Sequence, residues 1–469
     1  MDIEKEVESI TNELHPEWFH INNRPQLIKD ALKSILGQEP LGSQTDNVSN
    51  CFEEFWKEYS NENLARALKN FPKMESALYG LLREGSERYR DHYIHMFNNF
   101  IFGGQILTQI ALKCDESQLS AFFKVEKEIG LPSVFIPYSS LKRLFFLWTL
   151  ITNFHDIGIP MERINDLTRG LDNYLDYFGY NIAQFALGHH HSLEMESSKY
   201  ISIMGALFTN GIRPKGGIYE IPLEANRYVY KALSDAFDKH DQGIMAAIGL
   251  FNNIEDTFFR RTDKYKLNSE EFLIYYQRVL TQDIARAALA IAIHNLKPKD
   301  YPHLFPIAFS KLPITFLFIL CDEIGEFFRP EGITYSPLAK LKKWPGLGVN
   351  VFPEKSQIHI EVKFSYGEVS EADMFTILEQ AAQYLEQRGS SFLLTTKKIS
   401  ELKEKGEKGL PEAFDELNKY FSVYWDEREK HLGSKLELKS EGEIYLNLSI
   451  EMPTQKGRSI SKTYKLGVT

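Results

Sequence analysis

Leu144-Phe-Phe-Leu-Trp-Thr-Leu-Ile151 runs directly into Thr152-Asn-Phe-His-Asp-Ile-Gly158. The first part is apolar nearly all round a helix, which is typical of a helix buried on every side. Gly158 and Pro160 are stop signals, so we expect this helix to end near His155 and Asp156. A carboxylate at the end of a buried helix is costly unless it is paired, hydrogen-bonded or bound to a cation. The stretch therefore predicts a helical core with a polar site at one end. A capping Asp156 beside a core His155 is the plainer alternative.

Two other apolar helices carry isolated polar residues. The helix predicted over 313–328 is apolar from Ile314 to Cys321 and then reaches Asp322. On its own, Asp322 has the simpler interpretation of a surface residue or a buried partner for an arginine. His95 lies on a largely apolar helix predicted over 90–112, where a satisfied core histidine is the simpler interpretation. His92 lies three positions earlier, close to the same face.

The first 330 residues are predicted to be mainly helical, because apolar residues recur there with helical spacing and no strand alternation competes with it. Gly, Pro and Ser predict a loop at 37–47. We expect helices at 26–36, 48–59 and 63–68 in an N-terminal helical region (1–84), and at 90–112, 138–154, 171–187, 223–237, 243–251, 269–293 and 313–328 in a larger helical domain (85–330).

The pattern changes after Pro330, which predicts a smaller accessory α+β domain over 331–469. Residues 357–364 alternate polar and apolar side chains, as a half-buried strand does, and 340–349 has the composition of a linker or turn. We expect helices at 372–388 and 412–424, a short strand at 391–395, and a hairpin over 435–450 that turns near 440–442. The predicted fold class is mostly α, an all-helical domain followed by a smaller α+β domain.

The composition excludes several classes of protein. A net charge of -10 argues against general nucleic-acid binding, which needs a cationic surface. Cys51, Cys114 and Cys321 are too few for a disulfide framework or a zinc ribbon and suit a reducing compartment. The acidic start does not resemble a signal peptide, and no apolar run has the length of a membrane span. Walker loops, dinucleotide fingerprints and serine nucleophile elbows are absent. We therefore expect a cytoplasmic protein without a membrane segment.

Taken together, the polar residues resemble the HD superfamily of metal-dependent phosphohydrolases. The resemblance rests on RDHYIHMF (90–97), WTLITNFHDIG (148–158), AIAIHNL (290–296) and FLFILCDEIGEF (316–327), in the family's order. It implies an all-helical fold over 85–330 and one divalent metal bound by His95, His155, Asp156 and Asp322. Imidazoles and carboxylates suit Mn²⁺, Fe²⁺, Zn²⁺, Mg²⁺ or Co²⁺, and the lack of thiolates disfavours a structural zinc site. Such an ion lowers the pKa of a water molecule and polarises a phosphoryl oxygen.

The resemblance also implies a second metal, with Asp156 bridging the two ions. His294 follows a helix of small apolar residues; by itself it is a core residue, but in the family context it is a second-site ligand. Related chains have Asp-His-Gly at the start of a helix, whereas this chain has Asp241-Gln242-Gly243. Gln242 is a poor metal ligand, and His240 would replace the missing histidine only if the loop bends differently. The second metal is therefore conditional.

Basic and histidine-rich segments are candidates for contacts with a phosphate. Arg213 and Lys215, in the glycine-containing loop 210–217, are candidates to clamp phosphates, although a plain connection is the simpler interpretation. The histidines at 189–191 favour a solvated loop, the alternative being one that lines the cleft and donates to the leaving oxygen. The catalytic set is His92, Asp156, Arg213 and Lys215; the metal set is His95, His155, Asp156, His294, Asp322 and His240.

The expected activity is hydrolysis of a phosphoester or phosphoanhydride, with a nucleotide or cyclic nucleotide as the small-molecule partner. Two alternatives stay open. One is an HD-type nuclease on single-stranded nucleic acid, against which the acidic composition weighs. The other is a catalytically degenerate HD domain that senses nucleotides or acts as a scaffold, for which Gln242 is the best support. A homo-oligomer is also left open.

Overall fold

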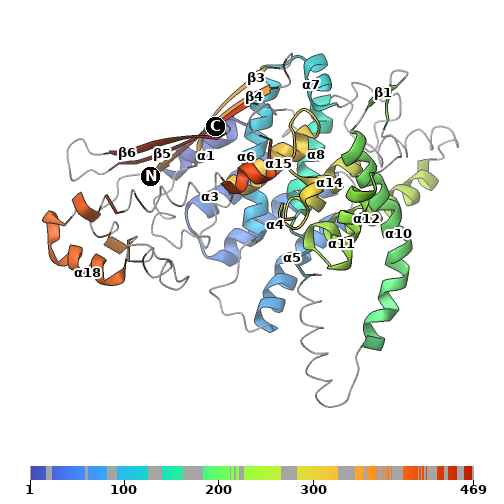
Figure 1. Ribbon diagram of the computed structural model, residues 1–469, viewed down its shortest axis with the longest axis horizontal. Coiled ribbons are helices and arrows are strands. Elements are labelled where there is room, and N and C mark those ends of the chain that lie inside the picture. The colour runs from blue at the N-terminus through green and yellow to red at the C-terminus, as the bar shows by residue number, and fades with distance from the viewer. Residues whose placement is uncertain are drawn as a thin grey trace. The chain divides into compact units, whose positions relative to one another are not determined.

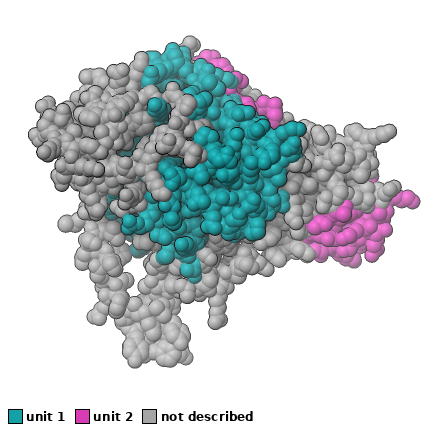
Figure 2. All heavy atoms as spheres, turned by 180° about the vertical axis from the view of Figure 1, so that it is seen from behind, with its two compact units in different colours: residues 1–322 teal, residues 323–469 magenta. Residues whose placement is uncertain are grey.

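In the computed structural model the chain forms two compact units, Met1–Asp322 and Glu323–Thr469 (Figure 2). Figure 1 labels their helices and strands. The structure describes residues 2–16, 24–58, 62–81, 92–124, 140–160, 162, 183–211, 213–215, 218–220, 226–265, 283–325, 344–352, 355, 357–366, 372, 375–376, 378–379, 382, 395–409, 411–413, 415–416, 419, 430–437, 442–451 and 459–466. The domain boundaries predicted at 84/85 and 330/331 lie outside these residues, as do the segments 171–182 and 269–282 of two predicted helices.

The first unit is built mainly from helices, as predicted. Its described elements are α1 (Ile3–Asn12), α3 (Arg24–Leu36), α4 (Leu41–Glu58), α5 (Glu62–Leu81), α6 (His92–Ala111), α7 (Glu116–Phe123), α8 (Ser140–Phe154), α10 (Ala183–Asn210), β1 (Arg213–Lys215), β2 (Ile218–Glu220), α11 (Arg227–Asp238), α12 (Gln242–Tyr265), α14 (Ala285–Ile293), the short 3-10 helix η3 (Pro302–Leu304) and α15 (Pro313–Gly325). None of the described helices combines the length and apolar character that a membrane crossing requires.

Four helices form the core around which the others pack. Helices α6, α8, α14 and α15 are apolar nearly all round, and almost every described side chain on them is buried. Helix α8 packs against α6 and α14, and α10 and α12 lie against α14. The buried positions of α6 include His95, and the chain leaves α8 and α14 at His155 and His294. The same helices that make the core thus carry its polar residues.

Glycine allows close backbone contact at two places in this core. A Cβ on Gly103 of α6 would stand 1.7 Å from the ring of Trp148 on α8, so only glycine admits the indole there. The indole Nε1 donates to the carbonyl oxygen of Phe100 at 3.1 Å, which fixes the ring across α6. A Cβ on Gly158 would stand 1.9 Å from the carbonyl oxygen of Gln242. Gly158 therefore lets the turn after α8 approach the first residue of α12.

Three local predictions in this unit were wrong. Residues 41–47 are helical, because α4 begins directly after Pro40, whose carbonyl oxygen accepts from Ser43 N at 2.8 Å and Gln44 N at 3.2 Å. The segment 188–192 lies within the backbone of α10 and is not a loop. The basic loop 210–217 contains β1, which pairs antiparallel with β2 in a two-stranded sheet. Short strands of this kind give no alternation long enough to detect in the sequence.

The second unit contains a four-stranded mixed sheet in the order β3-β4-β5-β6, which confirms a smaller α+β part. Its strands are β3 (Gly346–Phe352), β4 (Gln357–Tyr366), β5 (Gly442–Glu451) and β6 (Ser459–Leu466), and its described helices include α18 (Thr396–Glu404) and the 3-10 helix η6 (Gly406–Lys408). The strand predicted from residue 357 is β4, with Ile358, Ile360 and Val362 buried in alternation. Part of the linker predicted at 340–349 is strand β3.

The hairpin predicted over 435–450 was wrong. Residues 430–435 are helical, and Leu432 and Leu436 are both buried at helical spacing. Strand β5 instead pairs parallel with β4 and antiparallel with β6. Parallel neighbours need a crossover connection, which here runs through the segment that includes α18.

Candidate metal centre

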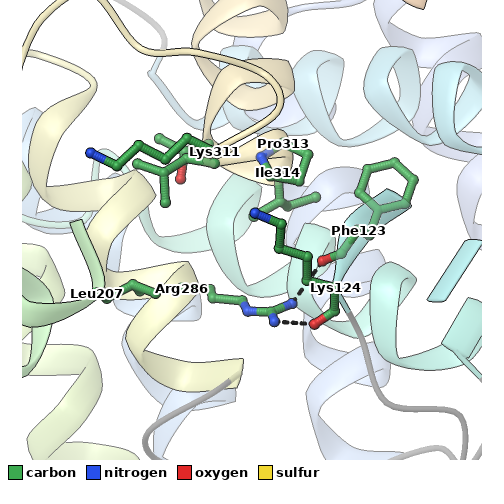
Figure 3. Close-up of a pocket in the computed structure, with 9 residues that line it drawn as sticks. Phe123, Lys124, Leu207, Arg286, Lys311, Pro313 and Ile314 are labelled. Atoms are coloured by element: carbon green, nitrogen blue, oxygen red, sulfur yellow. Dashed lines mark hydrogen bonds between the residues drawn. The ribbon is translucent and has the colours of Figure 1, made fainter. Parts of the chain in front are cut away.

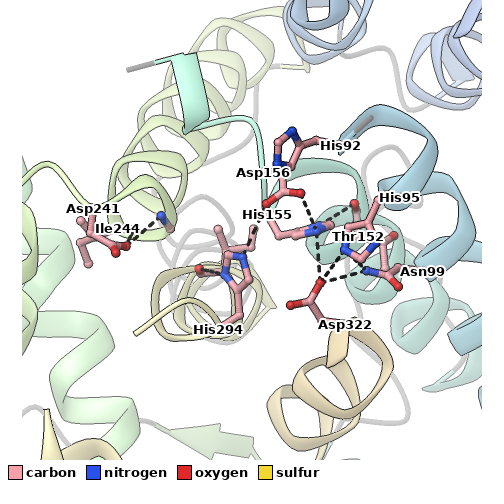
Figure 4. Close-up of polar contacts among 12 residues, drawn as sticks. His92, His95, Asn99, Thr152, His155, Asp156, Asp241, Ile244, His294 and Asp322 are labelled. Carbon is pink, nitrogen blue, oxygen red and sulfur yellow. Dashed lines mark hydrogen bonds and ion pairs between the residues drawn. The ribbon is translucent and has the colours of Figure 1, made fainter. Parts of the chain in front are cut away.

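Histidine and aspartate side chains from four separate segments meet inside the first unit (Figure 4). Helix α6 supplies His95, the turn after α8 supplies His155 and Asp156, the end of α14 supplies His294, and α15 supplies Asp322. Two groups of these residues, which share His155, have ligand atoms close enough together to hold an ion. The first is His95, His155 and Asp322; the second is His155, Asp156 and His294.

The distances between these ligand atoms fit a shared cation. His95 Nε2 lies 2.8 Å from Asp322 Oδ1, and His155 Nε2 lies 3.5 Å from the same oxygen. In the second group, Asp156 Oδ2 lies 3.3 Å from His155 Nε2, and Asp156 Oδ1 lies 3.8 Å from His294 Nε2. Ligands about 2.1 Å from one ion stand roughly 3.0 to 3.4 Å apart in octahedral or tetrahedral arrangement. The residues present therefore fit a divalent metal.

The orientation of two imidazoles is fixed by the helices that carry them. His155 Nδ1 lies 3.0 Å from the carbonyl oxygen of Thr152, and His294 Nδ1 lies 2.6 Å from that of Ile291. A carbonyl only accepts, so Nδ1 donates in each ring, and Nε2 of the neutral imidazole carries its lone pair toward the carboxylates. His155 is 0% exposed, and its Nε2 has no hydrogen-bond partner among the described residues. A backbone carbonyl that fixes the tautomer in this way is the usual support of a metal-binding histidine.

Phe318 forms an apolar wall of the site. It lies on α15 one turn before Asp322, and its ring centroid is 5.1 Å from that of His155 and 5.6 Å from that of His294. The imidazoles of His155 and His294 also meet edge to face, with centroids 5.2 Å apart. Buried rings around the polar atoms lower the local dielectric, which strengthens every charge interaction among them.

The pKa values show how strongly these charges interact. Burial lowers the pKa of His155, but the carboxylates of Asp156 and Asp322 outweigh it and leave that pKa above its ordinary value. Burial raises the pKa of Asp156, but His155 and His294 outweigh it and hold that pKa well below the ordinary value. Burial likewise raises the pKa of Asp322, but hydrogen bonding and charge from His95 depress it further than burial raises it. Both carboxylates are thus ionised across the neutral range.

Three residues near the centre were missed by the sequence analysis. Asn99, one turn after His95, has its amide Nδ2 3.0 Å from both His95 Nε2 and Asp322 Oδ1. Glu75 of α5 accepts a hydrogen bond from His92 Nδ1, and both side chains are buried. Asp241 caps α12 by accepting from Gly243 N at 2.9 Å and Ile244 N at 3.3 Å. Burial raises the pKa of Asp241, and His294 partly offsets that effect.

The other predicted site residues include His92, His240, Arg213 and Lys215. His92 is buried beside the centre, and its charge contributes to the low pKa of Asp156. His240 lies in the turn between α11 and α12 with a φ of 55°, and among the described residues it belongs to neither ligand group. Arg213 and Lys215 lie on strand β1. Their side chains, and those of the histidines at 189–191, lie outside the described residues.

A pocket lies where α7 ends, and its described lining contains no carboxylate or imidazole (Figure 3). Arg286 reaches into it and donates to the carbonyl oxygens of Phe123, at 3.0 Å, and Lys124. Lys311 lies 4.6 Å from the centre of the Phe208 ring, and burial lowers its pKa. The guanidinium satisfies the carbonyls at the end of a helix, so its observed contacts are those of a structural residue.

Comparisons of the chain with protein-family models, with curated proteins and with solved structures gave no significant match. The fold and the geometry of the centre therefore carry the functional argument.

Proposed function

We propose that this chain is a metal-dependent phosphohydrolase of the HD type, which cleaves a phosphoester or phosphoanhydride bond of a nucleotide or cyclic nucleotide. The order of the ligands along the chain is that of the family: a histidine, a histidine-aspartate pair at a helix end, and an aspartate on a later buried helix. His294 adds a ligand for a second ion.

One observation supports this proposal more than any other. Both His155 and His294 donate Nδ1–H to a carbonyl three residues earlier, so both direct a lone pair at carboxylate oxygens. While these imidazoles are neutral, two acceptors face each other inside the protein and repel, and a cation between them removes the repulsion.

The protein residues would then have distinct roles. His95, His155, Asp156 and Asp322 would hold one divalent ion, and His294 together with Asp156 would hold the second. A bound ion of this class supplies a water of lowered pKa and polarises a phosphoryl oxygen. His92 donates Nδ1–H to Glu75. Its Nε2, when protonated, would deliver a proton to the leaving oxygen of the substrate. Phe318 and the surrounding core limit the entry of bulk water.

The test combines metal analysis with a substrate screen on the full chain. We expect the wild-type protein to retain Mn²⁺, Fe²⁺ or Co²⁺ after gel filtration and to hydrolyse at least one compound in a panel of nucleoside phosphates and cyclic nucleotides. Asp156→Ala should lose metal and activity together, whereas Asp238→Ala, at an exposed position at the end of α11, should keep both. Full metal content in Asp156→Ala would show that the ligand assignment is wrong. Turnover of single-stranded oligonucleotides alone would favour a nuclease.

A further inference from the structure

Asn99 belongs to a group of three polar atoms whose three mutual contacts cannot all be hydrogen bonds. The group consists of His95 Nε2, Asp322 Oδ1 and the Asn99 side-chain amide. Their separations are 2.8 Å between histidine and aspartate, 3.0 Å between asparagine and histidine, and 3.0 Å between asparagine and aspartate. Asn99 is 0% exposed, so water does not reach the amide from solvent.

Each assignment of hydrogens leaves one contact between like groups, with Asp322 ionised as an aspartate is near neutral pH. If His95 Nε2 carries a proton for Asp322, it and Asn99 Nδ2 both donate to the same carboxylate oxygen, and the two donor nitrogens stand 3.0 Å apart with no hydrogen bond between them. If Nε2 is bare, it accepts from Asn99 but faces the Asp322 oxygen as acceptor against acceptor. Turning the amide by 180° instead places its oxygen 3.0 Å from the carboxylate oxygen.

A cation bound by all three groups removes the conflict. A bare imidazole nitrogen, a carboxylate oxygen and an amide oxygen are all acceptors, and all three are ligands of Mn²⁺, Fe²⁺, Co²⁺ and Mg²⁺. Three atoms about 3 Å apart form one face of an octahedron around an ion about 2.1 Å from each. The two ends of an asparagine amide are interchangeable by rotation, so the oxygen can take the position of Nδ2 without movement of helix α6.

The other end of the Asn99 amide agrees with this assignment. Asn99 Oδ1 is buried and has no hydrogen-bond partner among the described residues. An amide whose only task is to donate to Asp322 would leave this carbonyl unsatisfied, which is costly. Rotation of the amide makes this oxygen a metal ligand and moves the NH₂ group to the position that Oδ1 leaves.

We propose that Asn99 is a further ligand of the metal held by His95 and Asp322, bound through its side-chain carbonyl oxygen. The inference rests on the proposed metal centre and deepens it. With Asn99 the first ion has a neutral amide ligand in addition to its imidazoles and carboxylates. An extra neutral ligand leaves fewer positions for water and substrate on that ion without changing the charge of the centre.

The test compares Asn99→Leu with Asn98→Ala in the full chain. Leucine has nearly the shape of asparagine but no ligand atom, and Asn98 is the neighbouring buried asparagine on α6. We expect Asn99→Leu to weaken Mn²⁺ binding by about 10- to 100-fold in calorimetry, and to shift the visible absorption bands of bound Co²⁺. Asn98→Ala should change neither. A Co²⁺ spectrum and a Mn²⁺ affinity that both equal those of the wild type would overturn the assignment.

A structure of the Mn²⁺-loaded wild-type protein keeps the assignment falsifiable if Asn99→Leu does not fold. The Asn99 oxygen should lie about 2.2 Å from the ion; a separation above about 3 Å would reduce Asn99 to a hydrogen-bond donor and refute the proposal. Failure of the wild-type protein itself to bind Mn²⁺ or Co²⁺ would instead refute the metal centre, so the two failures are distinguishable.

Discussion

Arg143 and Asp283 form a salt bridge inside the first unit, with each side chain 1% exposed. The guanidinium donates from Nη2 to both carboxylate oxygens, at 2.8 and 2.7 Å, and from Nε at 3.1 Å. Arg143 lies in the first turn of α8, and Asp283 precedes α14. The same two helices end at His155 and His294, whose rings touch. The two helices therefore run in the same direction, joined by the ion pair at their starts and by the imidazoles at their ends.

Removing Arg143 should destabilise the protein strongly. Arg143→Leu leaves the Asp283 carboxylate buried without its partner, and we expect the free energy of unfolding to fall by about 3 to 5 kcal/mol. Urea denaturation measures this change in the free energy of unfolding. The double variant Arg143→Leu, Asp283→Leu buries no charge and should recover much of that loss. A double variant as unstable as the single one would show that packing of the arginine, and not its charge, stabilises the two helices.

The metal-free protein should lose stability as the pH rises above neutral. The pKa of His155 is raised above 6.5, so its contribution is complete below about pH 6.5 and is lost as the pH rises through the raised value. Asp156 and Asp322 have lowered pKa values, so their contribution is present above about pH 4 and is lost only in stronger acid. Urea midpoints in EDTA should therefore decline as the pH rises above about 6.5.

Added Mn²⁺ should reverse this decline, because the ion binds the deprotonated Nε2 of His155 and its affinity rises with pH. The matched control is His155→Gln, which has no titrating ring and should show neither the decline nor the rescue. Equal slopes in the wild type and His155→Gln would contradict the prediction.

Gly158→Ala should weaken metal binding without touching a ligand. The new Cβ would stand 1.9 Å from Gln242 O and 3.0 Å from Ala246 N, both backbone atoms, so the turn that carries Asp156 must move. We expect a loss of about 1 to 3 kcal/mol in stability and about 10-fold in Mn²⁺ affinity, measured by denaturation and calorimetry. Gly249→Ala in α12 is the control: a Cβ there meets nothing within 4 Å, and it should gain about 1 kcal/mol. Unchanged metal affinity in Gly158→Ala would show that the turn adapts.

His92 and Glu75 should affect turnover but not metal content, because neither belongs to a ligand group. Once a substrate is known, we expect His92→Ala to lower kcat by about 10²- to 10⁴-fold. Glu75→Gln keeps a hydrogen bond to the ring but no charge, so a smaller loss in kcat with little change in KM is expected. Elemental analysis and steady-state kinetics check both. Metal loss in His92→Ala would instead make this histidine a support of the centre.

The buried core and the polar residues that interrupt it were predictable because both depend on the same signal. A helix that is apolar all round must be buried, and each polar residue that interrupts it needs a partner. His95, His155, His294 and Asp322 stand out by this pattern, but their assignment to one metal centre came from the resemblance to the HD superfamily. Asn99 interrupts α6 with the same pattern, but a neutral amide inside a helix suggests no particular partner.

Other features depend on tertiary contacts that leave no trace in a short window of sequence. Glu75 lies on α5, which is amphipathic, and its burial follows from the contact with His92. Residues 430–435 form a helix where a strand was predicted to begin. Leu432 and Leu436 are buried four positions apart, as on a helix, and alternation over so few residues fits both a helix and a strand.

The order of the ligands along the chain determines when the centre can first exist during synthesis. His95 leaves the ribosome early and Asp322 last, at the final residue of the first unit. A nascent chain that has not reached α15, or a fragment cut before it, contains the imidazoles but lacks the carboxylate that both His95 and His155 approach. If the centre is a hydrolase site, an incomplete chain cannot consume nucleotides while it is still being translated. Activity would begin only with the complete first unit.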